Sequence, residues 1–315
     1  MYNNELTIVT YHYVRELEKT SYPSIKGLHL SKFKKQLEYF QRVYTFISIQ
    51  DIFNNLNHGE AFPANALLLT FDDGYTDHFI NVFPILNKLG IKGCFFPSAK
   101  PVQENKVLSV NKIQFILSSM KNVDDLLKNI YDSLDNNRHL YDLKSNDYYF
   151  NLLTRDLYGF DGKKITFIKR ILQKELEKKL RESIIDELFK KYVTCDEGSF
   201  ANELYMGMSE IKYMIDSGMH FGSHGYEHCW FNTISQKEQE KDIDAAIVFL
   251  NKLGIDSSIW TMCYPYGGYD YSLIEILKKK KFKFGFTVNK GIANINKNNV
   301  FTLKRFDTND LPITC

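Results

Sequence analysis

The sequence has no long uncharged apolar run, no excess of basic residues and no paired cysteine motif. No stretch reaches the roughly 18 consecutive apolar residues of a transmembrane helix, so we expect no membrane span. Lys and Arg (40) nearly balance Asp and Glu (38), which removes the electrostatic argument for nucleic-acid binding. Five scattered cysteines without a C-x-x-C pair favour reduced thiols. Residues 1–9 have no basic start followed by an apolar run, so we expect no signal peptide and a cytoplasmic location.

Short apolar runs alternate with amphipathic stretches in the first and last thirds of the chain. Such strand–helix alternation predicts a parallel sheet. It favours an irregular closed (β/α) barrel of about seven strands, a TIM-like α/β fold, with an open doubly wound sheet as the alternative. Strands are expected at Leu6–Tyr11, Tyr44–Ile49, Ala66–Phe71, Ile91–Phe96, Met219–Ser223, Ile259–Tyr264, Phe282–Val288 and Val300–Arg305. Helices are expected at Ser31–Val43 with Ser31 as N-cap, and at Asp51–Leu56, Asp77–Leu89, Ser235–Leu253 and Tyr271–Lys280.

The alternation is interrupted between residues 102 and 205, which form a polar, mostly helical insert. Residues 1–101 and 206–315 then make up the barrel. Helices are expected in the insert at Val110–Met120, Asp147–Leu157 and Ile165–Tyr192. One interpretation is an appendage that covers a barrel mouth or forms an interface. The other is a lid over the substrate site, because a segment that follows a barrel strand leaves from the face where barrel active sites lie.

Two adjacent carboxylates, Asp72 and Asp73, follow the apolar run Ala66–Phe71, and Gly74 comes next. Neighbouring residues of a strand point to opposite faces, so both can serve one site only where the backbone turns. A buried carboxylate without a partner costs several kcal/mol, which predicts a cation, a hydrogen-bond network or solvent around the pair. A solvated turn remains the alternative.

His224 and His228 form an H-x-x-x-H pattern just after another expected strand. On one helical turn, residues four apart lie about 5–6 Å from each other at Cβ, which suits two imidazoles on one ion. Together with the Asp pair they provide one carboxylate and two imidazoles, plus a second carboxylate. That is the composition of an open catalytic metal site with a separate base.

Three motifs in order, TFDDG (70–74), GMHFGSHGYEH (218–228) and YPYGGY (264–269), resemble those of the NodB-homology polysaccharide deacetylases, carbohydrate esterase family four. The resemblance covers nearly all of the chain outside the insert. It implies an irregular (β/α) barrel and N-deacetylation of amino sugars. By position, it implies that Asp72 is the general base and that Tyr266 donates a backbone N–H to the oxyanion. It also implies Asp73, His224 and His228 as metal ligands.

The chain also departs from the family pattern. Gly225 stands where Ser or Thr is usual, Cys263 stands where an Arg usually pairs with the base, and no His follows His228 to act as the general acid. The segment Thr10–Val14 is similar to one in the biofilm poly-N-acetylglucosamine deacetylases, a branch that also has the YPYG motif and in which an N-terminal His is the acid. We therefore assign His12 that role, with a hydrogen bond to a neighbouring loop as the alternative.

Several further residues are candidates for supporting roles. Arg305, after the last expected strand, is a candidate partner of the base, with an ordinary surface arginine as the alternative. Cys229, beside His228, is either a further ligand or a packing residue. Residues that support the site or contact substrate are expected among Tyr264, Pro265 and Gly267.

The sequence therefore predicts a metal-dependent hydrolase that removes an acetyl group from an N-acetylated sugar in a glycan or glycan precursor. The cofactor is expected to be one divalent ion; Asp with two His suits Zn²⁺, and Co²⁺, Ni²⁺ or Mn²⁺ also bind such sites. Two alternatives remain: an O-acetyl esterase or non-sugar amide hydrolase with the same site, and a family member that binds saccharide without turnover.

Overall fold

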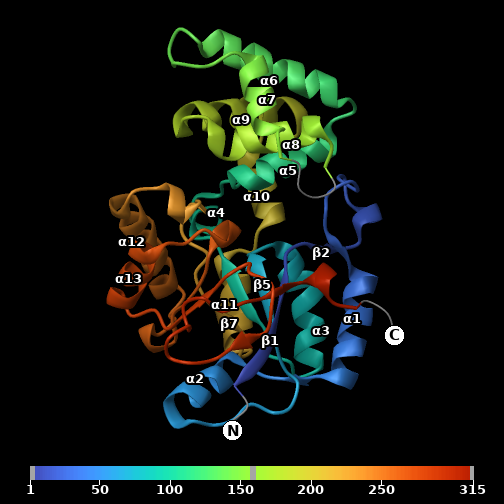
Figure 1. Ribbon diagram of the computed structural model, residues 1–315. Coiled ribbons are helices and arrows are strands. Elements are labelled where there is room, and N and C mark those ends of the chain that lie inside the picture. The colour runs from blue at the N-terminus through green and yellow to red at the C-terminus, as the bar shows by residue number, and fades with distance from the viewer. Residues whose placement is uncertain (1–3, 157–160, 313–315) are drawn as a thin grey trace. The chain divides into compact units, whose positions relative to one another are not determined.

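The computed structural model describes residues 4–156 and 161–312 and divides into two units (Figure 1). The barrel unit consists of Met1–Glu16, Lys26–Lys106 and Ala201–Cys315. The helical unit consists of Val107–Phe200 together with Leu17–Ile25, a short segment that the sequence pattern did not associate with the insert.

The strands of the barrel unit form a closed ring of parallel pairs. β1 pairs with β5, β5 with β6, and β6 with β7. A bridge between Ser223 and Met262 continues the ring to β8, which pairs with β9. A second bridge, between Phe286 and Leu303, leads along the chain to β11, which pairs with β1. These strands are β1 (Glu5–Tyr11), β5 (Ala66–Asp73), β6 (Cys94–Pro97), β7 (His220–Phe221), β8 (Thr261–Cys263), β9 (Phe284–Phe286) and β11 (Phe306–Asp307).

This ring confirms the expected irregular (β/α) barrel and excludes the open sheet. The irregularity lies in the short strands and in the two bridges that replace full strand pairs. Additional short strands are β2 (Val14–Arg15), which pairs with β3 (Leu28–His29), β4 (Thr45–Phe46) beside β5, and β10 (Ala293–Asn294), antiparallel to β1.

Alternation along β5 decides what faces the inside of the barrel. Leu67, Leu69 and Phe71 pack in the cluster that also contains helix residues such as Phe33 and Leu37. Leu68 points the other way, into a second cluster formed with Phe96 and Phe286 of other strands. Because strand side chains alternate, Thr70 and Asp72 continue the inner row begun by Leu68. The sequence thus places Asp72 at the carboxyl end of the barrel interior.

Two of the predicted strands are largely wrong. In Tyr44–Ile49 the paired strand is limited to Thr45 and Phe46, because Asp51 accepts the backbone N–H of Ser48 at 2.7 Å and a helix begins at Ile49. In Val300–Arg305 only Leu303 makes a bridge, since the preceding residues form turns held by Asn296 and Asn299. The remaining strands are present with shifted bounds: those at Leu6–Tyr11 and Ala66–Phe71 are slightly longer than expected, and the others are shorter.

Helices surround the strands of the barrel unit (Figure 1), namely α1 (Leu30–Val43), α2 (Ile49–His58), α3 (Phe83–Lys88), α4 (Ala99–Glu104), α11 (Met208–Asp216), α12 (Gln236–Lys252) and α13 (Tyr271–Lys279). The predicted N-cap Ser31 is wrong: the side chain of His29 accepts the N–H of Ser31 instead. The helix expected at Asp77–Leu89 begins with a wide π turn, η2 (His78–Val82). Pro84 has no N–H to donate to the preceding turn, which favours this widening.

The helical unit contains α5 (Ser109–Ser119), α6 (Val123–Asn137), α7 (Asn146–Leu153), α8 (Lys163–Arg170), η3 (Ile171–Glu175) and α9 (Lys178–Tyr192), and α10 (Glu197–Leu204) crosses its boundary. The single helix predicted at Ile165–Tyr192 is wrong, because the chain becomes extended at Leu176 and Glu177 caps a new helix. The last residue of the predicted Asp147–Leu157 helix lies outside the described residues. Within residues 4–156 and 161–312, no helix is long and apolar enough to cross a membrane.

Candidate active site

Asp72 and Asp73 end β5, and both carboxylates are almost fully buried, at 2% and 4% exposure. Alternation alone would send the two side chains to opposite faces. The backbone of Asp73 is instead left-handed, with φ of 71°, and Gly74 follows with φ of 72°. A Cβ at Gly74 would lie 2.5 Å from the Cβ of Pro97, so only glycine fits this turn. The turn brings the second carboxylate back to the site of the first.

Asp73, His224 and His228 form one buried cluster. The Oδ1 atom of Asp73 lies 3.4 Å from Nε2 of His224 and 3.1 Å from Nε2 of His228. Although these atoms are close, Oδ1 has no hydrogen-bond partner among the described residues. Burial would raise the pKa of Asp73, but the two facing imidazoles hold that pKa well below its ordinary value. The cluster therefore contains a carboxylate with a lowered pKa whose inner oxygen, Oδ1, lacks a hydrogen bond within residues 4–156 and 161–312.

These three donor atoms fit a divalent cation. Ligand atoms about 2.0–2.2 Å from a tetrahedral zinc ion lie roughly 3.3–3.6 Å from each other. The two oxygen–nitrogen spacings here, 3.1 and 3.4 Å, are close to this, and all three donor atoms lie within 4.8 Å of one another. A cation would also satisfy the Oδ1 atom of Asp73, which is costly to bury alone. The donor set of one carboxylate and two imidazoles suits zinc and related transition metals.

Hydrogen bonds fix the ring of His224 and the loop that connects it to His228. Nδ1 of His224 donates to the carbonyl oxygen of Cys263 at 2.8 Å, which leaves the lone pair of Nε2 facing Asp73. The loop between the histidines is held by Asp242, whose carboxylate accepts the N–H groups of Tyr226 at 2.7 Å and Glu227 at 2.9 Å. Asp242 was not identified from the sequence, because it lies 14 positions beyond His228 on a helix.

The assumption of a helical turn for H-x-x-x-H is wrong. His224–His228 is an irregular loop after β7, in which Gly225 and His228 have left-handed φ values of 72° and 56°. A Cβ at Gly225 would lie 2.9 Å from Oδ1 of Asp242. Glycine in place of the usual Ser or Thr therefore allows the loop to approach Asp242. The two imidazole rings still meet, with centroids 4.8 Å apart.

Asp72 is paired with Arg305 rather than with the cluster. Nη1 and Nη2 of Arg305 donate to the two carboxylate oxygens at 2.9 and 2.8 Å, and the arginine is only 1% exposed. Thr10 donates a further hydrogen bond to Oδ2 at 3.1 Å. Burial alone would raise the pKa of Asp72, but the Arg305 charge and its hydrogen bonds hold that pKa well below its ordinary range. The alternative of a surface arginine is therefore wrong.

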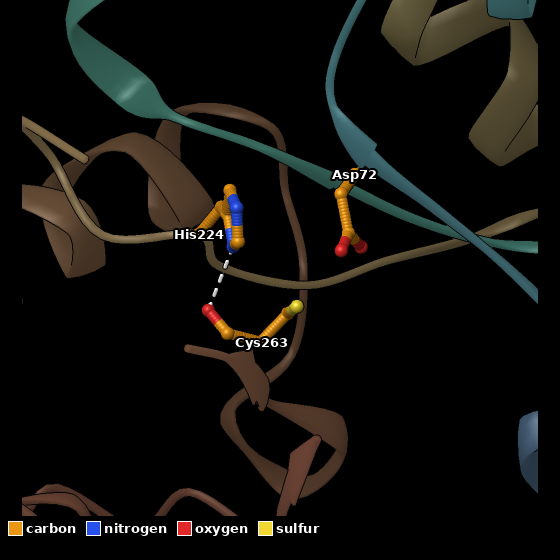
Figure 2. A group of neighbouring side chains, drawn as sticks. All are labelled: Asp72, His224 and Cys263. Carbon is orange, nitrogen blue, oxygen red and sulfur yellow. Dashed lines mark hydrogen bonds between the residues drawn. The ribbon is translucent and has the colours of Figure 1, made fainter. Parts of the chain in front are cut away.

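Cys263 occupies the position where the family usually has its arginine. Figure 2 shows the carbonyl oxygen of Cys263 hydrogen-bonded to His224, with the Cys263 sulfur on the side of Asp72. The sulfur lies within 4.8 Å of donor atoms of both residues. Burial raises the pKa of this thiol, which keeps it neutral beside the carboxylate. Arg305 reaches Asp72 from the other end of the chain, so Asp72 has an arginine partner although the usual position carries a small thiol.

We expect Arg305→Met to cost about 3–5 kcal/mol of unfolding free energy, because it leaves the buried Asp72 carboxylate without its partner. Burial then becomes the dominant influence and raises the pKa of Asp72 above the unfolded value, so the cost is largest at neutral pH and shrinks as the pH falls. Urea unfolding at neutral and mildly acidic pH measures this. The control is Lys304→Met, which removes an exposed neighbouring cation. If the two variants lost the same unfolding free energy, the Asp72–Arg305 pairing would be contradicted.

His12 lies at the mouth of the same site. Its Nε2 atom is 4.0 Å from Oδ2 of Asp72, too long for a hydrogen bond, and its side chain is 47% exposed. Nε2 of His78 donates to the carbonyl oxygen of His12 at 2.8 Å and anchors its backbone. The structure thus brings His12 to the cluster with its imidazole accessible to solvent. His78 was missed in the sequence, since a buried histidine in a helix shows no motif.

The YPYG motif forms the short helical turn Pro265–Gly267 beside His228. Tyr266 has a left-handed φ of 56°, and its ring stacks on Trp230 with centroids 4.4 Å apart and meets His228 edge-on at 4.7 Å. Gly267 has a φ of 69°, and a Cβ there would lie 2.4 Å from Val288. Tyr266 and Trp230 therefore form an aromatic wall next to the proposed metal ligands.

Two residues grouped with this motif are not placed to contact a substrate. Tyr264 is fully buried and donates its hydroxyl to the carbonyl oxygen of Phe301 at 2.9 Å, and Pro265 is buried. Of the two roles expected for them, support of the site or contact with substrate, these contacts favour support of the loop. Cys229 directs its sulfur to Asp242 at 3.8 Å and packs against the core, which excludes the ligand interpretation.

A (β/α) barrel whose carboxyl end gathers a carboxylate–imidazole cluster beside a second carboxylate is typical of hydrolases that activate water. The polysaccharide deacetylase family model matches residues 59–139 and 184–285. The chain belongs to the polysaccharide deacetylase family and is a carbohydrate deacetylase, as its motifs predicted. No curated protein sequence matches the chain significantly.

Three solved structures are similar in fold. The deacetylase PplD of Streptococcus pyogenes, in complex with acetate, is 16% identical, with a TM-score of 0.58 over 96% of this chain and 92% of that chain. IcaB from Ammonifex degensii is 17% identical, with a TM-score of 0.57 over 98% and 93%. The BpsB deacetylase domain from Bordetella bronchiseptica is 12% identical, with a TM-score of 0.57 over 98% and 97%. Because these sequence identities are low, the comparisons show a similar fold and nothing beyond it.

Proposed function

We propose that this protein removes the acetyl group from an N-acetylated amino sugar in a glycan or glycan precursor, with one divalent ion as cofactor. The supporting observation is the convergence of Asp73, His224 and His228, with a second carboxylate, Asp72, alongside. One carboxylate oxygen of Asp73 also has no hydrogen bond in the described part of the chain. Zn²⁺ is the cation we propose, and Co²⁺, Ni²⁺ or Mn²⁺ would suit the same donors.

Each residue of the site has a distinct proposed role. Asp73, His224 and His228 would hold the cation, which when bound polarises the acetyl oxygen and acidifies a water molecule. Asp72, kept ionised by Arg305, accepts the proton of the attacking water. The backbone N–H of Tyr266 donates to the oxygen that becomes negative. His12, exposed at the mouth, gives a proton to the leaving amine.

The aromatic wall supports a saccharide as the substrate. The flat faces of Tyr and Trp pack well against apolar faces of sugar rings, and both rings of the wall are partly exposed. Tyr266 also contacts His228, so a sugar packed on this wall would bring its acetamido group close to the proposed metal ligands. The buried Asp72–Arg305 pair argues against a binding module without turnover, because saccharide binding alone needs no ionised base.

Acetate release from N-acetylglucosamine oligosaccharides by the zinc-loaded protein tests the proposal, with free amines measured in parallel. Matched O-acetylated sugars and a non-sugar acetamide separate the alternative substrates. His12→Gln is expected to lower turnover about a hundredfold if His12 is the acid. Release from the ester or the non-sugar amide alone would replace the proposed substrate, and no release from any of them would favour the binding module.

A further inference from the structure

Tyr75 is a buried residue that neither the motif nor the proposed mechanism uses. Its hydroxyl donates to Oδ2 of Asp73 at 2.6 Å. The tyrosine is fully buried, and its ring stacks on Tyr13 with centroids 3.9 Å apart and on Tyr205 with centroids 6.0 Å apart. The backbone on either side is also tied down, because Tyr75 bridges Tyr205 and Met206 donates its N–H to Gly74. The phenol is therefore held in one place.

The two oxygens of the Asp73 carboxylate have different surroundings. Oδ2 accepts the short hydrogen bond from Tyr75, whereas Oδ1 lies 3.1 and 3.4 Å from the two imidazole nitrogens and has no hydrogen bond within the described parts of the chain. A carboxylate free to rotate about its bond to Cβ could present both oxygens to a cation. The hydrogen bond from the Tyr75 hydroxyl to Oδ2 opposes this rotation and leaves Oδ1 on the side of the two imidazoles.

We propose that Tyr75 is a positioning residue that makes Asp73 a one-oxygen ligand of the cation. The inference rests on the proposed metal site and adds how that site is kept open. If both oxygens of Asp73 bound the cation, the protein would supply four donor atoms instead of three. Less room would then remain for water and substrate. Catalytic zinc sites keep a position open, and outer-shell partners orient the ligands that leave it open.

The test is Tyr75→Phe, which keeps the stacked ring and removes the hydroxyl. Cobalt(II) is the probe, because its visible absorption reports coordination number and chelator competition reports its affinity. We expect affinity to fall about 10–100-fold and the visible absorption to weaken, because a two-oxygen carboxylate raises the coordination number. Should this variant not fold, Tyr13→Leu removes the ring that holds the phenol, and the same direction of change is expected.

Tyr11→Phe is the matched control. Tyr11 is also fully buried, and its hydroxyl also donates at 2.6 Å, but to the side chain of Gln36. We expect this variant to lose stability while its cobalt affinity and spectrum match those of the unmodified protein. If Tyr75→Phe also keeps the cobalt affinity and visible spectrum of the unmodified protein, the positioning role of Tyr75 is overturned and the proposed function remains. If the unmodified protein binds no cobalt or zinc, the proposed metal site fails, and this inference fails with it.

Discussion

Asp72→Asn is expected to lower acetate release on the order of a thousandfold or more. Asparagine has nearly the same shape as aspartate but cannot accept the proton of the attacking water. In the unmodified protein Arg305 holds the pKa of Asp72 well below its usual range, so we expect this carboxylate to stay ionised throughout the neutral range. We therefore expect no loss of activity from protonation of Asp72 until the pH is far below neutral. Rates of acetate release across pH measure both effects.

The control for this variant is Asp77→Asn. Asp77 is also a buried aspartate paired with an arginine, since Oδ2 accepts Nε of Arg15 at 2.7 Å, and it also accepts the N–H of Val14. Asp72→Asn leaves the buried Arg305 without its carboxylate, and Asp77→Asn does the same to the partly buried Arg15. Both variants should therefore lose stability, and rates are compared where circular dichroism shows each to be folded. Only Asp72→Asn is expected to lose nearly all turnover. Equal acetate release by the two variants would remove Asp72 from the role of base.

The barrel was predictable because its local signals agree with each other. Ala66–Phe71 is almost entirely apolar and lies in a strand that is buried throughout. The helix expected at Ser235–Leu253 is bounded by a Ser235 capping box and by Gly254 in the left-handed region. The errors occur where a local pattern competes with another contact. Tyr44–Ile49 has the composition of a strand, but the Ser48–Asp51 capping box starts a helix inside it. Such a box involves only four residues and is easily read as a polar interruption of a strand.

The proposed ligands could be placed from spacing, but their geometry could not. H-x-x-x-H suggested a helix, whereas left-handed residues at Gly225 and His228 bring the rings together in a loop. Arg305 lies 233 residues from Asp72 along the chain, so their pairing depends on closure of the barrel. Tyr75 directly follows the TFDDG motif, yet nothing in the sequence shows that its hydroxyl faces Asp73 rather than solvent.

Removal of the cation is expected to abolish acetate release almost completely. Loss of a Lewis acid that contributes several kcal/mol to the transition state corresponds to a rate decrease on the order of a thousandfold or more. Dialysis against a strong chelator, followed by addition of one equivalent of Zn²⁺ or Co²⁺, measures the loss and the recovery. Recovery by the metal alone would show that the chelator had not damaged the fold.

Zinc should also stabilise the protein, because the folded state brings Asp73, His224 and His228 together and the unfolded chain does not. At a free concentration a thousand times the dissociation constant, the gain is about 4 kcal/mol. Protons compete for the two imidazoles, so this gain should shrink as the pH falls. Asp73→Ala removes the ligand with the inner oxygen and should lose both the gain in melting temperature and the rescue of activity. If Asp73→Ala responds to zinc as the unmodified protein does, the cation binds elsewhere and Asp73 is not a ligand.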